Sequence, residues 1–129
     1  MSIDIFEIVR VLTNHLTNLT LKPALVEVKY KPLQGSIPKN CFNNAFRALS
    51  FDSNALYVLG YVFVHNIPIE HCWIKSMDTY YDITFPPGED HIYISVMELT
   101  LNEIFPYVEK NMTSPNLYDL NRFFDKNLK

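Results

Sequence analysis

The chain has 129 residues, of which 48% are hydrophobic and 14% aromatic, and its formal net charge is −3. So large an apolar fraction excludes a disordered chain, and the length suits a single domain that buries a core without a disulfide or a structural metal. The acidic balance argues against a general nucleic-acid-binding protein, which would carry a basic excess.

The sequence also bears on where the protein resides. It holds no run of the roughly 18 to 20 apolar residues that a membrane span requires. Asp4 and Glu7 stand near the N-terminus, where a secretory signal peptide would be basic. We therefore expect a cytoplasmic protein without membrane contact, in which both cysteines are free thiols.

The first part of the chain holds two predicted helices and one strand. Apolar residues at helical spacing predict an amphipathic helix over residues 3–19. Alternation of apolar and polar residues predicts a half-exposed strand over 24–31, and the prolines and glycine of 31–40 predict a loop. Helical spacing resumes over 41–50, where Asn40 is a suitable N-cap residue.

β-Branched and aromatic residues dominate the middle of the chain. They predict a buried strand over 56–64, followed by a turn at 66–68. Two further strands are expected over 69–75 and 79–85, and a fourth over 91–96. The short connections between these strands favour antiparallel pairing.

The last part of the chain favours two helices. Thr100 and Glu103 form a capping-box pattern that opens the first of them. Ser114 followed by Pro115 predicts the N-cap and first residue of the second, which carries apolar residues at helical spacing. Because the strands cluster instead of alternating with helices, the predicted fold class is α+β, in one domain over residues 1–129.

Three residues could form a site for nucleophilic catalysis. Cys41 stands at the predicted N-terminus of a helix, where the helix dipole favours the thiolate. His71 could form an ion pair with that thiolate and later protonate a leaving group. Asp82 lies in the next strand and could hold the imidazole in the required tautomer, since a short turn between antiparallel strands brings such residues side by side.

The segments that carry these residues resemble the transglutaminase-like core of the papain-like cysteine enzymes. In that family a Cys opens a helix, a strand ending in Gly-Tyr follows, and then come a His-Ala-Trp-Val strand and an Asp-Pro-Thr strand. The matching segments of this chain, in the same order, are Cys41–Phe46, Tyr57–Val62, His71–Ile74 and Tyr80–Thr84. The resemblance covers roughly residues 34–86, and the family-like core extends to about residue 96.

The resemblance implies both a fold and an activity. The fold is a papain-like or transglutaminase-like core, in which the helix that begins at Cys41 packs on a small antiparallel sheet, with further helices towards both ends of the chain. The activity is acyl transfer by a triad of Cys41, His71 and Asp82, which either cleaves an amide or exchanges one amine for another. No cofactor is implied.

Further residues are candidates for supporting roles. Gln34 lies upstream of Cys41, one residue further away than the Gln that helps to form the oxyanion hole of papain-type enzymes. Asn40 and Trp73 are candidates for the lining of the site, since Asn40 precedes Cys41 and Trp73 shares a strand face with His71. The backbone N–H of Cys41 is another candidate donor to an oxyanion.

The residues beside the triad have plainer interpretations. Cys72 falls on the strand face opposite His71, so it is expected to pack in the core. Glu70 is expected to be a solvated strand residue. Asn43 and Asn44 either lie on the helix surface or touch a substrate, and the sequence leaves both alternatives open.

Two functions remain open at this stage. The first is a cysteine-dependent enzyme that hydrolyses an amide, peptide or isopeptide bond of a protein or peptide through a thioester on Cys41. The second is a non-catalytic module on the same fold that binds or inhibits a partner protein. This alternative is favoured by Ile83, which stands where the family's Asp-Pro-Thr strand has proline. No Cys-x-x-Cys or His-Glu-x-x-His spacing occurs, so we expect no metal site and no cofactor.

Overall fold

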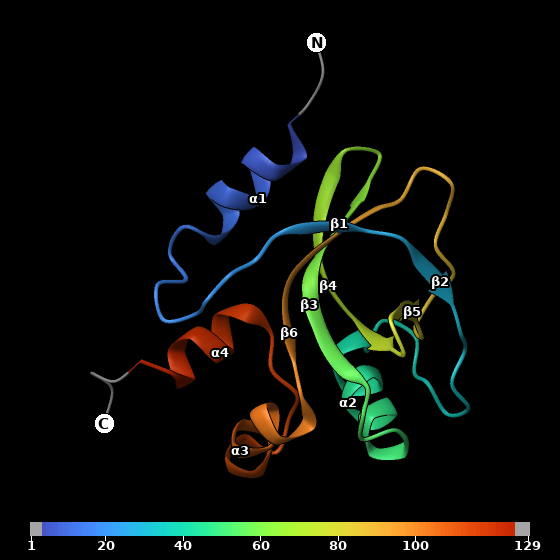
Figure 1. Cartoon of the computed structure of the whole chain (residues 1–129), viewed down its shortest axis with the longest axis vertical. Coiled ribbons are helices and arrows are strands. Elements are labelled where there is room, and N and C mark those ends of the chain that lie inside the picture. The colour runs from blue at the N-terminus through green and yellow to red at the C-terminus, as the bar shows by residue number, and fades with distance from the viewer. Residues whose placement is uncertain (1–3, 126–129) are drawn as a thin grey trace.

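The computed structural model describes residues 4–125 and has a mixed α+β architecture (Figure 1). Its helices are α1 (Ile5–Thr13), α2 (Cys41–Phe51), α3 (Leu101–Asn111) and α4 (Leu117–Phe123). Its strands are β1 (Ala24–Val26), β2 (Val28–Tyr30), β3 (Leu56–Val64), β4 (Ile67–Ser76), β5 (Thr79–Asp82) and β6 (Ile92–Leu99). These strands form one six-stranded sheet, so the predicted α+β class is confirmed.

The sheet has the strand order β1-β6-β3-β4-β5-β2 and curls on itself. β3 lies inside it and pairs antiparallel with β4 and β6. Only Glu27 separates β1 from β2, yet β1 pairs antiparallel with β6 at one edge and β2 pairs parallel with β5 at the other. One short segment therefore bridges both edges of the sheet, and Figure 1 shows it in blue, crossing over the other strands.

The curled sheet has an inner and an outer face, each with its own apolar cluster. The buried residues of the inner cluster are Val58, Val62, Trp73 and Tyr93. The larger outer cluster joins the opposite face of the same strands to residues from every helix, which include Val9 of α1, Ala45 of α2, Ile104 of α3 and Leu120 of α4. The helices thus cover the outer face, while the segment that holds β1 and β2 closes the inner one.

The N-terminal helix is shorter than the sequence predicts. α1 ends at Thr13, whose hydroxyl donates to the carbonyl oxygen of Val9 at 2.7 Å, and turns and bends follow to residue 19. Leu16 is nevertheless buried. The helical spacing correctly predicted that Leu16 is buried, although this residue lies beyond the end of α1. The predicted start at residue 3 lies outside the described residues.

Two predicted strands have different limits for physical reasons. The strand expected over 24–31 is two short strands, because the chain changes its pairing partner at Glu27. The strand expected over 79–85 ends at Asp82, because the carboxylate of that residue accepts two backbone N–H groups just downstream and turns the chain. The parallel pairing of β2 with β5 also means that the sheet is not entirely antiparallel.

The connection between β3 and β4 lies earlier than expected. His65 and Asn66, both with positive φ, form the turn, so Pro68 belongs to β4. A proline is tolerated there because β5 pairs only with residues 74–76 of β4, which leaves Pro68 at an edge. β6 continues beyond its predicted end to Leu99.

One of the two C-terminal helices begins as predicted and the other does not. The hydroxyl of Thr100 accepts the N–H of Glu103 at 3.2 Å, and the Glu103 carboxylate accepts the N–H of Thr100 at 2.9 Å, so the capping box is present. α4 begins at Leu117 and not at Pro115. Asn116 caps its first turn, because its side-chain oxygen accepts the N–H of Asp119 at 2.7 Å.

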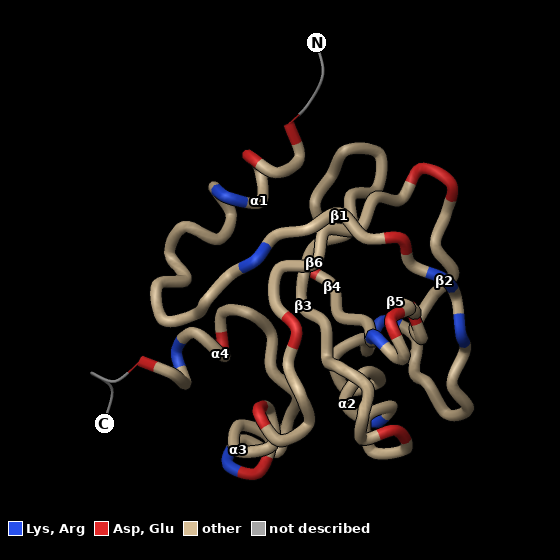
Figure 2. The backbone as a smooth tube through the Cα atoms, viewed as in Figure 1, with Lys and Arg blue, Asp and Glu red and all other residues tan. Residues whose placement is uncertain are grey.

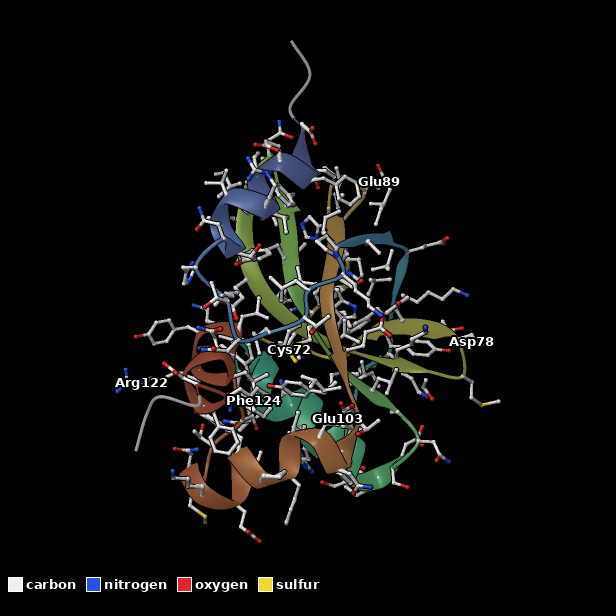
Figure 3. All side chains as sticks on the ribbon, turned by 60° about the vertical axis from the view of Figure 1, so that its left-hand side comes forward. Cys72, Asp78, Glu89, Glu103, Arg122 and Phe124 are labelled. Carbon is white, nitrogen blue, oxygen red and sulfur yellow. The ribbon has the colours of Figure 1, made fainter. Side chains whose placement is uncertain are left out.

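Charged residues are distributed over helices, loops and strand ends (Figure 2). Asp78, Glu89 and Arg122 lie at the periphery of the molecule, whereas Cys72 lies between the sheet and the helices (Figure 3). Within residues 4–125 no helix has both the length and the apolar character that a membrane span requires.

Candidate active site

The candidate site is built around the N-terminus of α2. Cys41 is the first residue of this helix and is 8% exposed. The preceding loop enters the helix through Lys39, whose φ of 66° lies in the left-handed region. Asn40 occupies the predicted N-cap position, but its side chain accepts from the Asn43 amide at 3.1 Å and does not cap the helix. The first N–H groups of α2 therefore have no side-chain cap and can donate to a ligand.

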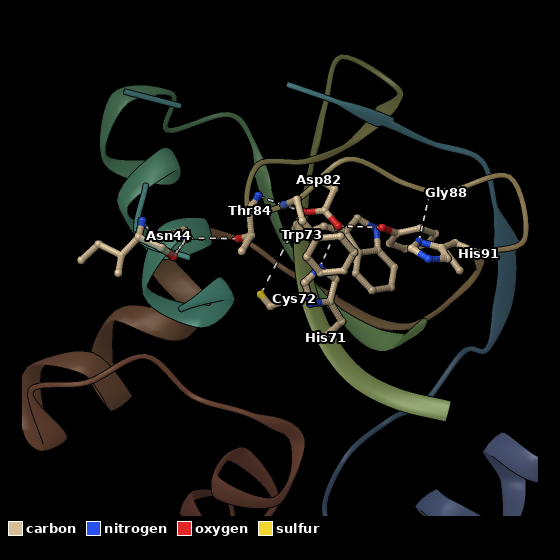
Figure 4. A network of polar contacts seen from close by, with 11 residues as sticks. Asn44, His71, Cys72, Trp73, Asp82, Thr84, Gly88 and His91 are labelled. Atoms are coloured by element: carbon tan, nitrogen blue, oxygen red, sulfur yellow. Dashed lines mark hydrogen bonds and ion pairs between the residues drawn. The ribbon is translucent and has the colours of Figure 1, made fainter. Parts of the chain in front are cut away.

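His71 and Asp82 form a buried pair (Figure 4). His71 Nε2 lies 2.7 Å from Asp82 Oδ2, and the two residues are 4% and 0% exposed. β4 carries His71, and β5 ends at Asp82. Because Ile74 of β4 pairs antiparallel with Tyr81 of β5, Asp82 lies beside the part of β4 that precedes Ile74, which includes His71.

Cys41 and His71 line the same pocket, and the thiol influences the imidazole. Because Nε2 of His71 is engaged by Asp82, Nδ1 is the nitrogen that remains available to a thiol. Burial would lower the pKa of His71, but hydrogen bonds and charge interactions with Asp82 and Cys41 outweigh it and raise the pKa to about 9. In cysteine enzymes a protonated imidazole is the group that pairs with the nucleophilic thiol.

Asp82 is held by hydrogen bonds on both carboxylate oxygens. Oδ1 accepts the backbone N–H of Thr84 at 2.9 Å and that of Phe85 at 3.2 Å. Oδ2 accepts the hydroxyl of Tyr93 at 2.6 Å and faces His71. Burial would raise the pKa of Asp82, but the hydrogen bonds and the charge of His71 hold it below its usual range. Asp82 is therefore an anion that balances the imidazolium.

A pocket of about 410 Å³ opens beside Cys41 and His71. The residues that complete its lining are Pro38, Lys39, Phe42, Ile69, Glu70, Thr84 and Phe85, most of them apolar. Lys39 and Ile69 are exposed, so the pocket reaches solvent. A ligand in this space would meet the thiol and the imidazole, while Asp82 lies behind the imidazole.

Three other predicted site residues, Gln34, Asn40 and Trp73, are not part of the pocket lining. Gln34 is exposed and lines a different pocket, together with Phe51 at the far end of α2, so it does not face Cys41. Trp73 is fully buried, and its ring centroid lies 6.0 Å from that of His71. Trp73 thus supports the imidazole from inside the sheet and does not line the pocket.

The two neighbours of His71 in β4 have structural environments. Glu70 is half-buried and therefore only partly solvated: its carboxylate accepts the N–H of Leu117 at 3.0 Å, and burial raises its pKa. Cys72 is fully buried in the outer cluster, as expected, and burial raises the pKa of its thiol well above the ordinary value.

The roles of Phe85, Tyr93 and Asn44 were not predicted from the sequence: Asn44 is buried, so it does not lie on the helix surface, and it does not line the pocket. The Phe85 ring covers His71 at 4.6 Å between centroids, and Tyr93 binds Asp82 from β6. Neither contact has a local signal, because it depends on which strands pair. For Asn44 there was a local signal: it falls on the same side of the predicted helix as Cys41, where a polar side chain needs a hydrogen-bond partner.

Among residues 4–125, no group of three His, Cys, Asp or Glu side chains could hold a metal ion. Comparison of the chain with protein-family models, with curated proteins and with solved structures found no match.

Proposed function

We propose that this protein is a cysteine-dependent enzyme that cleaves an amide, peptide or isopeptide bond of a protein or peptide through a thioester on Cys41. The observation that carries this proposal is the arrangement of Cys41, His71 and Asp82 beside one solvent-accessible pocket. The resemblance of four segments to transglutaminase-like enzymes supports a papain-like core, in which α2 carries the nucleophile and β4 and β5 carry its partners.

In the first half-reaction the Cys41 thiolate attacks the carbonyl carbon of the substrate, and an electron pair moves onto the carbonyl oxygen. The backbone N–H of Cys41 can stabilise that oxyanion, since the first turn of α2 has no side-chain cap. His71 then gives its proton to the leaving amine as the carbon–nitrogen bond breaks, and the acyl group remains on sulfur as a thioester.

In the second half-reaction water attacks the thioester while His71 takes a proton from it, and Cys41 leaves as the thiolate. Asp82 keeps a proton on Nε2 of His71, so that Nδ1 alternately gives and takes the transferred proton. Because the pocket reaches solvent, water has access to the thioester. This access favours hydrolysis over transfer to an amine.

The lining of the pocket favours an apolar side chain on the acyl half of the substrate. Phe42, Ile69 and Phe85 offer apolar surface beside Cys41. Covering such surface with an apolar group stabilises a complex by about 25 cal/mol per Å² removed from water.

Intact-mass and product analysis tests this function. The protein is incubated with a peptide library rich in apolar residues, with and without a high concentration of methylamine. We expect hydrolysed products in both conditions, none with Cys41→Ala, and unchanged products with Cys72→Ala. The amine adduct as main product would replace hydrolysis by transfer and keep the thioester. No Cys41-dependent product in either condition would favour a non-catalytic module that binds or inhibits a partner protein.

Ile69 and Ile67 provide a matched test of the acyl pocket. They lie on the same face of β4 and are 49% and 63% exposed, but only Ile69 lines the pocket. We expect Ile69→Asp to lower kcat/KM for apolar acyl groups by about tenfold or more, and Ile67→Asp to leave it unchanged. An equal effect of both variants would contradict this placement of the acyl group.

A further inference from the structure

Asn44 connects α2 to two distant segments of the chain. It lies one helical turn after Cys41 and is only 3% exposed. Its side-chain oxygen accepts the N–H of Ile37 at 3.0 Å. Its amide nitrogen donates to the carbonyl oxygen of Ile37 at 2.9 Å and to the hydroxyl of Thr84 at 3.1 Å.

Thr84 extends this network to the buried pair, as Figure 4 shows. The backbone N–H of Thr84 donates to Asp82 Oδ1 at 2.9 Å, and Asp82 Oδ2 lies 2.7 Å from His71 Nε2. A continuous series of hydrogen bonds therefore runs from the helix that carries the nucleophile to the imidazole that faces it.

The bonds to Ile37 hold the loop in front of the nucleophile. The Ile37 side chain is 57% exposed, so apolar packing does not fix this part of the loop. The paired bonds from Asn44 to its N–H and C=O fix it instead. The same loop contributes Pro38 and Lys39 to the pocket wall.

Asn44 is the polar residue on the buried side of α2, where its neighbours include Ala45, Ala48 and Leu49. Hydrogen bonds are directional, so those of Asn44 fix the helix relative to the loop and to Thr84 more narrowly than apolar contacts alone.

From this geometry we infer that Asn44 is a positioning residue, which acts through Thr84 to keep Cys41 on α2 in register with His71 and Asp82. The inference rests on the proposed acyl-transfer function. A displacement of about 1 Å between reacting groups can cost on the order of 100-fold in rate, so the loss of this register should be measurable.

Thr84 allows the inference to be tested without removing Asn44. Asn44→Ala would remove three hydrogen bonds at once and would mix positioning with folding. Thr84→Val removes only the hydroxyl, keeps the side-chain shape, and leaves the backbone N–H on Asp82. Thr84→Ser restores a hydroxyl and is the matched control.

The measurement is the pH profile of Cys41 alkylation by iodoacetamide, followed by peptide mass spectrometry, with thermal unfolding recorded in parallel. At about pH 6.5 we expect Thr84→Val to react about tenfold more slowly than the wild type and Thr84→Ser to react within about twofold of it. A Thr84→Val profile that matches the wild type would overturn the inference and leave the proposed function standing. Equal slowing in Thr84→Ser would also overturn it. A wild-type Cys41 that is inert at this pH would overturn the proposed function, and the inference with it.

Discussion

Asp82 determines which nitrogen of His71 keeps its proton when the imidazole is neutral. Its Oδ1 is occupied by the backbone N–H groups of Thr84 and Phe85, which can only donate. Its Oδ2 faces His71 Nε2 and the hydroxyl of Tyr93. A side chain that replaces Asp82 must place a hydrogen-bond acceptor where Oδ1 lies. Its other polar group then faces the imidazole.

We expect Asp82→Asn to abolish most activity while the fold persists. The amide oxygen stays on the two backbone donors, so the NH2 group faces His71 Nε2 and forces the imidazole proton onto Nδ1, towards Cys41. The imidazole then cannot take the thiol proton, and turnover should fall by about 1,000-fold or more. Peptide hydrolysis and circular dichroism are the measurements. An unfolded variant would make Asp82 a structural residue, and wild-type turnover would mean that another group orients His71.

The raised pKa of His71 also predicts how stability depends on pH. Its pKa is about 9 in the folded protein against an ordinary value of 6.5, so between these limits the folded imidazole holds a proton that the unfolded imidazole lacks. The contribution of His71 to stability is complete below pH 6.5 and is lost as the pH rises through 9, but a thiolate at Cys41 gives up one proton and offsets it.

Urea unfolding of Cys41→Ala and of Cys41→Ala/His71→Gln over this pH range measures the effect without the titration of the thiol. The protein that keeps His71 should lose more stability as the pH rises, because only that protein releases the proton of His71. Parallel curves for the two proteins would show that the pKa of His71 is not raised by folding.

At the scale of elements, β3 depends on a close approach to its neighbours at Gly60. A Cβ atom at this position would lie 2.1 Å from the carbonyl oxygen of Ile94 and 2.8 Å from the Trp73 ring. The register of β3 against β6 shifts at the same point, between Leu59 and Gly60. A glycine here lets Trp73 and β6 pack together behind His71.

Gly60→Ala should therefore destabilise the protein by roughly 1 to 3 kcal/mol, because either the backbone or the Trp73 ring has to move. Urea unfolding measures this change. Gly88→Ala is the control, since its Cβ would meet only the side chains of His91 and Asp90, at 3.1 Å or more. If both variants lost the same stability, the close approach at Gly60 would not be what requires glycine.

The sequence predicts those elements whose signals are local. The start of α2 at Cys41 and the capping box at Thr100 are examples, because a change of apolar spacing or a cap lies within a few residues of the boundary. Prediction from the sequence fails where contacts between distant segments determine the boundary of an element. The split at Glu27 depends on β5 and β6, and the end of β5 depends on the hydrogen bonds of the Asp82 carboxylate.

At the scale of the whole molecule, the candidate site forms where two faces of the sheet meet. His71 shares the inner face with Trp73, whereas Cys41 belongs to α2, which packs on the outer face. The two side chains come together beside the part of β4 that β5 leaves unpaired, since β5 reaches only residues 74–76. The curl of the sheet and the early end of β5 thus create the site.

This arrangement explains how much of the site could be predicted. The residue types and order of Cys41, His71 and Asp82 are visible in the chain, and in the structure Cys41 and His71 line one pocket with Asp82 behind the imidazole. The distance of Gln34 from that pocket is not visible, because it depends on how the loop folds back along α2. The hydrogen bond between Asn44 and Thr84 could not be predicted either, because Thr84 lies 40 residues away in the chain.

Iodoacetamide labelling between about pH 5 and pH 9, resolved by peptide mass spectrometry, tests the central claim most directly. At about pH 6.5 an unperturbed thiol is only about 1% ionised. If Cys41 and His71 form an ion pair, Cys41 should be alkylated at this pH well before the buried Cys72, and His71→Gln should slow Cys41 towards the rate of an unperturbed thiol. Slow and equal labelling of both cysteines, or an unchanged Cys41 profile in His71→Gln, would contradict the assignment of Cys41 as a nucleophile.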